Sequence, residues 1–205
     1  MSKSYRDQKF LYHLTTVENL PSILRHGLCS RFELSRQQIG YRNIADADIL
    51  SKRGSLAGCV PFHFLCKSPF DHAVVKKYGD CNFVYLCVER VYAERNGWQI
   101  VPKHPLAGGA GEPLEWTDGM SAIDWSMVDS NIDWAVDPRP KQARMAEALG
   151  PSIVPITAIA AAIFQRKRDE IAWTEHLKDG KRWVIANPKM FPQNDDRLSQ
   201  SQPVR

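Results

Sequence analysis

The chain has 205 residues, of which 43% are hydrophobic, and its 27 basic and 23 acidic side chains give a net charge of +4. This length supports one hydrophobic core, so we expect a single domain over residues 1–192 and a flexible polar tail at 193–205. The odd number of cysteines, five without a C-x-x-C pair, argues against a disulfide framework or a zinc ribbon. No apolar run approaches the roughly 18 residues of a membrane helix, and we expect a cytoplasmic protein.

The first third of the chain predicts a strand, a helix and a loop. Residues 9–14 (KFLYHL) are aromatic and aliphatic, as in a buried strand. Thr15 or Thr16 is expected to cap the helix that follows, and Gly27 to end it. The apolar residues of this helix have helical spacing: Leu20, Ile23 and Leu24. Residues 33–57 are polar with weak periodicity and predict a mobile loop with at most one helical turn.

The rest of the chain mixes short strands irregularly with helices. Residues 58–65 (GCVPFHFL) predict a buried strand whose proline leaves its pairing incomplete, and residues 82–89 a central strand. Between them, residues 68–79 predict a helix that Ser68 caps. Residues 182–192 predict a last strand. The irregular order favours an α+β fold over a doubly wound parallel sheet.

Candidate residues are ambiguous when each is taken alone. His13 lies in the first strand, where a histidine more often fills a core than binds a ligand. Arg53 lies in a polar loop, where arginines are usually solvated, and Glu147 could be an exposed helix position. A zinc site remains a minor alternative, because its four possible ligands fit no common spacing: Cys59, Cys66, His63 and His72.

Four segments in order along the chain resemble the DarT family, the toxins of DarT–DarG toxin–antitoxin pairs. They are YHLTTVENLPSILRHGL at 12–28, VPFHFLCKSP at 60–69, IDWSMVDSNIDWAVDPRPKQARMAEAL at 123–149 and SIVPITAI at 152–159. Two short sequences differ from the forms that are commoner in the family: PFHF stands in place of PFYF, and SPF in place of SPM. The resemblance covers roughly residues 10–165.

The resemblance implies an ADP-ribosyltransferase-like fold with a split central β-sheet and flanking helices. It implies a toxin that uses NAD⁺ as co-substrate, without a metal, and modifies a base in single-stranded DNA. Members divide between guanine and thymine, and the departures in wording favour guanine. An antitoxin with a macrodomain is the implied partner, and we expect a monomer. The alternatives are an ADP-ribosyltransferase acting on protein or RNA, and a non-catalytic nucleic-acid-binding module.

The same resemblance assigns roles to individual residues. His13 is expected to hold the NAD⁺ ribose, and Thr15 and Asn19 to line the nicotinamide end. Glu147, in ARMAEAL, matches the catalytic glutamate, whose carboxylate would stabilise the oxocarbenium-like transition state. Arg53 is the expected catalytic arginine and a cofactor ligand, with Arg42 as its rival. The expected cofactor-binding set is completed by Gly27 and Arg31.

The DNA site is expected just upstream of Glu147. Single-stranded DNA is commonly held by stacking on aromatic rings and by a basic groove. The candidates are Trp125, Trp134, Arg139, Lys141 and Arg144. Either tryptophan could equally belong to the core. A second basic run, RKR at 166–168, is more often a solvated face. Together with Lys181 and Arg182 it is the alternative DNA site.

Overall fold

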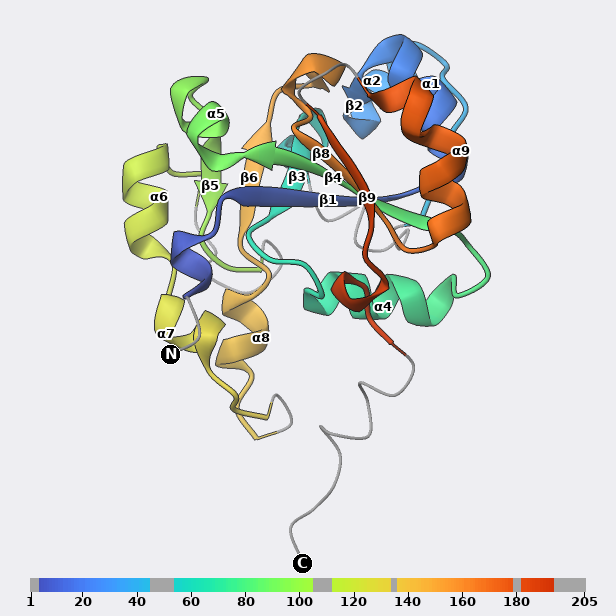
Figure 1. The fold of residues 1–205 in the computed structure, drawn as a ribbon. Helices are drawn as coiled ribbons and strands as arrows, with labels where there is room; N and C mark the ends of the chain where they lie inside the picture. Colours follow the sequence, from blue (N-terminus) through green and yellow to red (C-terminus); the bar gives the residue numbers. More distant parts are fainter. Residues whose placement is uncertain (1–3, 45–53, 105–111, 134–135, 179–181, 194–205) are drawn as a thin grey trace, which may run out of the picture.

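The computed structural model describes residues 4–44, 54–104, 112–133, 136–178 and 182–193 (Figure 1). Its centre is a seven-stranded sheet in the order β5-β6-β3-β1-β4-β8-β9, and β2 and β7 form a separate two-stranded sheet. The large sheet consists of β1 (Phe10–Thr16), β3 (Val60–His63), β4 (Phe83–Glu89), β5 (Gln99–Val101), β6 (Glu147–Gly150), β8 (Ala161–Phe164) and β9 (Trp183–Ala186). The small sheet consists of β2 (Leu28–Cys29) and β7 (Ile153–Val154).

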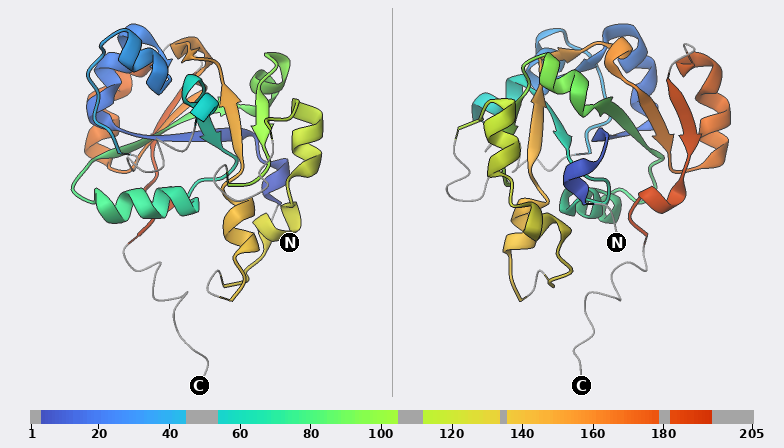
Figure 2. Two further views of the ribbon diagram at one scale, coloured as in Figure 1. Left: turned by 180° about the vertical axis from the view of Figure 1, so that it is seen from behind. Right: turned by 60° about the vertical axis from the view of Figure 1, so that its left-hand side comes forward.

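Helices cover both faces of the large sheet. The α-helices are α1 (Leu20–His26), α2 (Arg31–Arg36), α4 (Pro69–Lys77), α5 (Arg90–Arg95), α6 (Trp116–Ala122), α7 (Trp125–Asp129), α8 (Arg139–Ala143) and α9 (Lys167–Leu177). The 3₁₀ turns are η1 (Tyr5–Asp7), η2 (Val17–Asn19), η3 (Gly54–Gly58), η4 (Ile156–Ala158) and η5 (Pro188–Met190). The views of Figure 2 place α4 below the sheet and α1, α2 and α9 above it. The mixed architecture confirms the expected fold class.

The alternation of side chains in β1 and β4 builds two separate core layers. Leu11 in β1 and Leu86 in β4 belong to the larger cluster, which includes α1 side chains. Tyr12 and Tyr85, each one residue out of phase, belong to the second cluster, beside Val74 of α4. Both faces of β4 are therefore covered, which explains its continuous apolar sequence.

The large sheet opens between β1 and β3. These strands pair at Tyr12 and His63, whereas β1 pairs with β4 over seven residues. Pro61 has no backbone N–H to donate, so β3 cannot form a regular ladder here. The incomplete pairing predicted for residues 58–65 is confirmed, and the opening positions the candidate site.

The predicted cap is confirmed for one helix and wrong for another. The predicted helix at 68–79 is confirmed as α4, where Ser68 and Asp71 form a reciprocal capping box. The prediction that Thr15 or Thr16 caps the next helix is wrong. A 3₁₀ turn comes before α1, and neither its cap residue Thr16 nor Asn19 at the start of α1 makes a side-chain capping bond.

The polar segment at 33–57 contains more structure than predicted. Helix α2 begins at Arg31, with Ser30 as its cap, and a 3₁₀ turn ends the segment at 54–58. Residues 45–53 lie outside the described part of the chain. No helix in the part that the structure describes is long and apolar enough to cross a membrane.

Candidate active site

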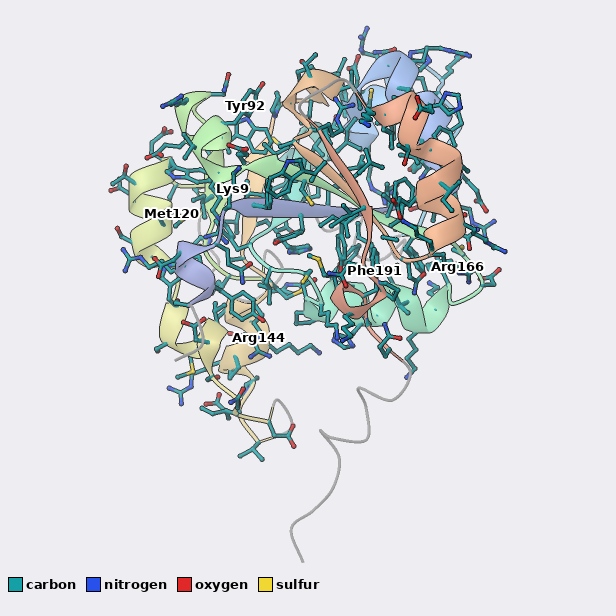
Figure 3. The ribbon with its side chains drawn as sticks, in the orientation of Figure 1. Lys9, Tyr92, Met120, Arg144, Arg166 and Phe191 are labelled. Carbon is teal, nitrogen blue, oxygen red and sulfur yellow. The ribbon has the colours of Figure 1, made fainter. Side chains whose placement is uncertain are left out.

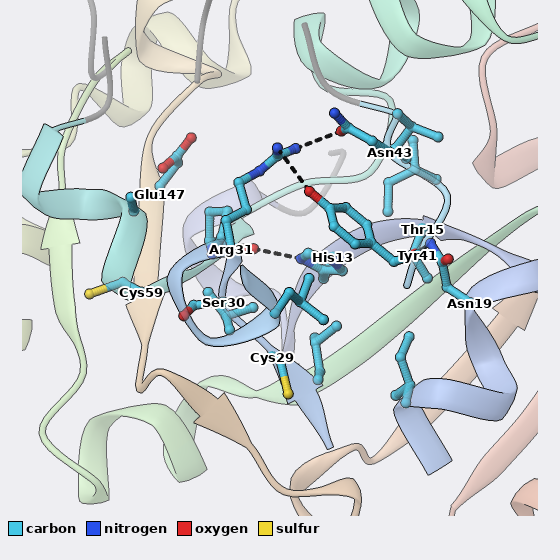
Figure 4. A pocket seen from close by; sticks show the side chains of 18 of the residues that line it. His13, Thr15, Asn19, Cys29, Ser30, Arg31, Tyr41, Asn43, Cys59 and Glu147 are labelled. Atoms are coloured by element: carbon cyan, nitrogen blue, oxygen red, sulfur yellow. Dashed lines mark hydrogen bonds between the residues drawn. The ribbon is translucent and has the colours of Figure 1, made fainter. Parts of the chain in front are cut away.

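A pocket lies where β1 and β3 diverge (Figure 4). Its walls include β1, the stretch from α1 to α2, the segment 41–44, β3 and the first residue of β6. Six of the expected residues line it: His13, Thr15, Asn19, Gly27, Arg31 and Glu147. Arg42 also lines it, whereas Arg53 lies outside the described residues.

His13 is held as a neutral imidazole. Its Nδ1 lies 2.9 Å from the carbonyl oxygen of Pro61, and because a carbonyl only accepts, Nδ1 carries the proton. Burial lowers the pKa of His13 from 6.5 to about 4, against an opposing effect of this hydrogen bond. The ring packs against Phe62 at 5.4 Å between centroids. The Nε2 atom of the neutral ring is therefore a hydrogen-bond acceptor.

Glu147 is a carboxylate buried at the start of β6, with 3% of the residue exposed. Its register partners are His63 in β3 and Val101 in β5, so strands fix its backbone on both sides. Glu147 and His13 line the same pocket, and the charge of Glu147 opposes the fall in the pKa of His13. Strand β6 thus delivers a carboxylate to the wall of a pocket that also holds a neutral histidine.

Arg31 brings a positive charge to the pocket. Its guanidinium donates to the Tyr41 hydroxyl at 3.3 Å and to Asn43 Oδ1 at 2.8 Å (Figure 4). It also lies 5.9 Å from the centre of the Tyr41 ring, within range of a cation–π contact. Tyr41 and Asn43 were not predicted as site residues, because neither type stands out in a polar segment.

Arg42, the rival for the catalytic arginine, directs its guanidinium elsewhere. Its Nη2 lies 3.8 Å from Cys81 Sγ, beside Asp80. The Arg42 N–H donates to Asn19 Oδ1 at 2.7 Å, and Asn19 Nδ2 donates to the Arg42 carbonyl oxygen at 3.0 Å. Asn19 also donates to Thr15 Oγ1 at 3.1 Å.

Gly27 lets the chain turn tightly at the floor of the pocket. Its φ of +79° lies in the left-handed region that favours glycine. A Cβ atom there would lie 2.8 Å from Ile153 Cγ2 and 3.0 Å from the Val154 carbonyl oxygen. This glycine both ends α1, as predicted, and allows the small sheet to pack closely behind the pocket.

The four possible zinc ligands do not form a metal site in the structure. Within the described residues, no three side chains of His, Cys, Asp or Glu gather as a group that could hold a metal ion. His63 instead lies close to the Ala146 carbonyl, at 3.4 Å from its Nδ1, and packs against Phe70.

Comparison with known proteins decides the family. A family model described as "ssDNA thymidine ADP-ribosyltransferase, DarT" matches residues 12–191. The chain belongs to the DarT family.

Two curated relatives support this assignment. The DNA ADP-ribosyl transferase of Thermus sp. (strain 2.9) is 25% identical over 190 residues, covering 83% of this chain and 89% of the relative. A DNA ADP-ribosyl transferase–DNA ADP-ribosyl glycohydrolase fusion protein of Thermosipho africanus (strain H17ap60334) is 42% identical over 45 residues. That match covers 22% of this chain and 12% of the fusion protein.

Solved DarT structures share the fold. Thermus sp. 2.9 DarT in complex with ADP-ribosylated ssDNA has a TM-score of 0.76 at 19% identity, covering 94% of this chain and all of that one. Thermosipho africanus DarTG in complex with ADP-ribose has a TM-score of 0.75 at 22% identity, covering 90% of this chain. This chain spans about half of that fusion chain, since the match covers 51% of its length.

Two of the DNA-binding candidates make hydrogen bonds to the backbone of the protein itself. Trp125 is buried, its Nε1 donates to the Met120 carbonyl at 2.8 Å, and its ring meets Phe64 edge-on. Arg144 is half-buried and donates to the carbonyl oxygens of Val128 and Ser130 at 2.9 and 2.5 Å (Figure 3). We therefore expect both to stabilise α7 rather than to contact DNA.

The remaining candidates on α8 are available at the surface. Arg139 is exposed and pairs with Asp137, 2.7 Å away, and Lys141 is exposed one residue beyond Pro140. Trp134 lies outside the described residues. The second basic cluster, at 166–168, lies at the opposite side of the molecule, at the start of α9 (Figures 1 and 3).

Arg182, considered with that second cluster as an alternative DNA site, does not belong to a basic surface. It is buried, and its guanidinium donates to the carbonyl oxygens of Ile159, Ile156 and Leu177. Each bond satisfies a backbone acceptor, so the guanidinium joins the end of α9 to the η4 turn.

Proposed function

We propose that this DarT-family chain transfers ADP-ribose from NAD⁺ to a base of single-stranded DNA and releases nicotinamide. The observation that carries the proposal is the meeting of His13, Arg31 and Glu147 in one pocket of a chain that belongs to this family. The bond between the ribose C1′ atom and nicotinamide breaks, and its electron pair leaves with nicotinamide. A bond from C1′ to the base then forms, and the base loses a proton.

Each of these side chains suits one part of NAD⁺. The Glu147 carboxylate would accept a hydrogen bond from a ribose hydroxyl and stabilise the positive charge that develops at C1′. The His13 Nε2 atom would accept from a hydroxyl of the other ribose, because Nδ1 is committed to Pro61. The Arg31 guanidinium would bind the diphosphate, for which its planar donors are suited.

Thymidine is the acceptor we propose. The matching family model is described for thymidine. We give this description more weight than the prediction of guanine, which relied on the PFHF and SPF sequence differences. A related fusion protein combines the transferase with a DNA ADP-ribosyl glycohydrolase. We therefore propose that this chain is the toxin of a pair and that its antitoxin removes ADP-ribose. We further propose that it acts as a cytoplasmic monomer.

The test is transfer of label from ³²P-NAD⁺ to oligonucleotides that each contain a single kind of reactive base. We expect labelling of single-stranded DNA that contains thymine, and none of protein or RNA. The matched variant Glu147→Gln keeps the size of the side chain and removes its charge. We expect it to lose about a hundredfold or more in rate with an unchanged melting temperature. Labelling of RNA or protein in place of DNA would contradict the proposal.

A further inference from the structure

The carboxamide of Asn19 is occupied within the protein. The Arg42 N–H donates to its Oδ1 at 2.7 Å, and its Nδ2 donates to the Arg42 carbonyl at 3.0 Å and to Thr15 Oγ1 at 3.1 Å. Both hydrogens of the amide group are therefore committed, and only 8% of the residue is exposed. A direct contact between this amide group and nicotinamide would break one of these bonds.

The bonds to Arg42 fix the middle of a segment whose two flanking side chains hold Arg31. Tyr41 accepts from the Arg31 guanidinium through its hydroxyl, and Asn43 through Oδ1. The next residue, Ile44, is buried in the core layer that contains Tyr12. The segment 41–44 is thus attached at Arg42 and at Ile44, and the side chains on either side of Arg42 present two acceptors to one guanidinium (Figure 4).

We propose that Asn19 is a positioning residue that clamps the backbone of Arg42 and thereby sets the orientation of the Arg31 guanidinium in the NAD⁺ pocket. The inference rests on the proposed function, because Arg31 is the group proposed to bind the diphosphate. It replaces the expectation that Asn19 contacts nicotinamide. An arginine free to rotate would lose side-chain freedom on binding NAD⁺, and the clamp reduces this loss in advance.

The clamp requires an amide. An alanine at position 19 removes both bonds to Arg42. An aspartate keeps the acceptor for the Arg42 N–H but turns a second oxygen towards the Arg42 carbonyl, where two acceptors repel. Asn19→Asp should therefore lie between the parent and Asn19→Ala. The chain also offers a matched control, since Asn96 at the end of α5 is an exposed asparagine whose Nδ2 donates to the Tyr92 carbonyl.

The test is a double-mutant cycle on NAD⁺ affinity, measured by calorimetry with Asn19→Ala, Arg31→Ala, the double variant and Asn96→Ala. We expect Asn19→Ala to weaken binding about tenfold, the size of effect that loss of an ordinary hydrogen bond can have, and Asn96→Ala to bind as the parent does. In the Arg31→Ala background, Asn19→Ala should cause no further loss, because its effect passes through Arg31. Full, independent losses from both changes would overturn the proposal.

Hydrogen exchange of the Arg42 amide tests the clamp without ligand. We expect exchange to accelerate about tenfold or more in Asn19→Ala, to a smaller extent in Asn19→Asp, and not in Asn96→Ala. The Val17 amide, which donates to the Asn82 carbonyl, reports on the adjacent strand end and should be unchanged. Unchanged exchange at Arg42 in both position-19 variants would overturn the clamp. A parent that binds no NAD⁺ would instead refute the proposed function, while exchange still decides the clamp.

Discussion

Acidification should destabilise the protein through His13. Burial lowers its folded pKa to about 4, against 6.5 for an ordinary histidine, so the unfolded chain binds a proton that the folded chain rejects. The lowered pKa of His13 therefore contributes to the free energy of unfolding. This contribution is fully present above pH 6.5, falls as the pH drops from 6.5 towards 4, and is absent below about 4. At about 1.4 kcal/mol per pKa unit, the difference corresponds to about 3 kcal/mol at most, because the ring is only partly buried.

Urea denaturation of the parent and His13→Gln at pH 7.5, 6.5, 5.5 and 4.5 measures this contribution. A glutamine can still donate to the Pro61 carbonyl but does not titrate, so the parent should lose more stability than the variant between pH 6.5 and 4.5. Comparing the two cancels the other groups that titrate in this range. Equal losses of the free energy of unfolding in the two proteins would refute a neutral His13 with a lowered pKa in the folded state.

Three further substitutions test other parts of the structure. Gly27→Ala should lower the free energy of unfolding by about 1 kcal/mol or more, because the new Cβ meets Ile153 and the Val154 carbonyl; parental stability in urea denaturation would contradict this. Trp125→Ala should lower the free energy of unfolding by about 3–5 kcal/mol. If a stable Trp125→Phe variant failed to bind DNA, the structural role proposed for this ring would be contradicted. The double change Arg139→Ala with Lys141→Ala should flatten the salt dependence of oligonucleotide affinity by about 0.7 for each phosphate that the protein no longer neutralises; an unchanged slope would place the DNA groove elsewhere.

The sequence predicted the elements whose signals are local. Strand β4 could be predicted from seven consecutive residues, all but the last buried in the fold, and α4 from a serine, a proline and an aspartate within four positions. The opening of the sheet at β3 could also be predicted, because Pro61 lacks a donor whatever surrounds it. The order of matching segments along the chain led to the DarT family, and to His13 and Glu147 in one pocket.

Tertiary structure decided which polar and aromatic residues are structural and which face the pocket. Trp125 and the arginines at 144 and 182 suit a DNA surface in sequence, yet packing buries Trp125 and Arg182 and half-buries Arg144, and backbone carbonyls accept their hydrogen bonds. The clamp between Asn19 and Arg42 joins residues 23 positions apart, and no periodic pattern encodes such a contact. The physical reason is that periodicity reports which side of an element is apolar. The partner of a buried polar group depends instead on which distant backbone atoms the fold brings within about 3 Å.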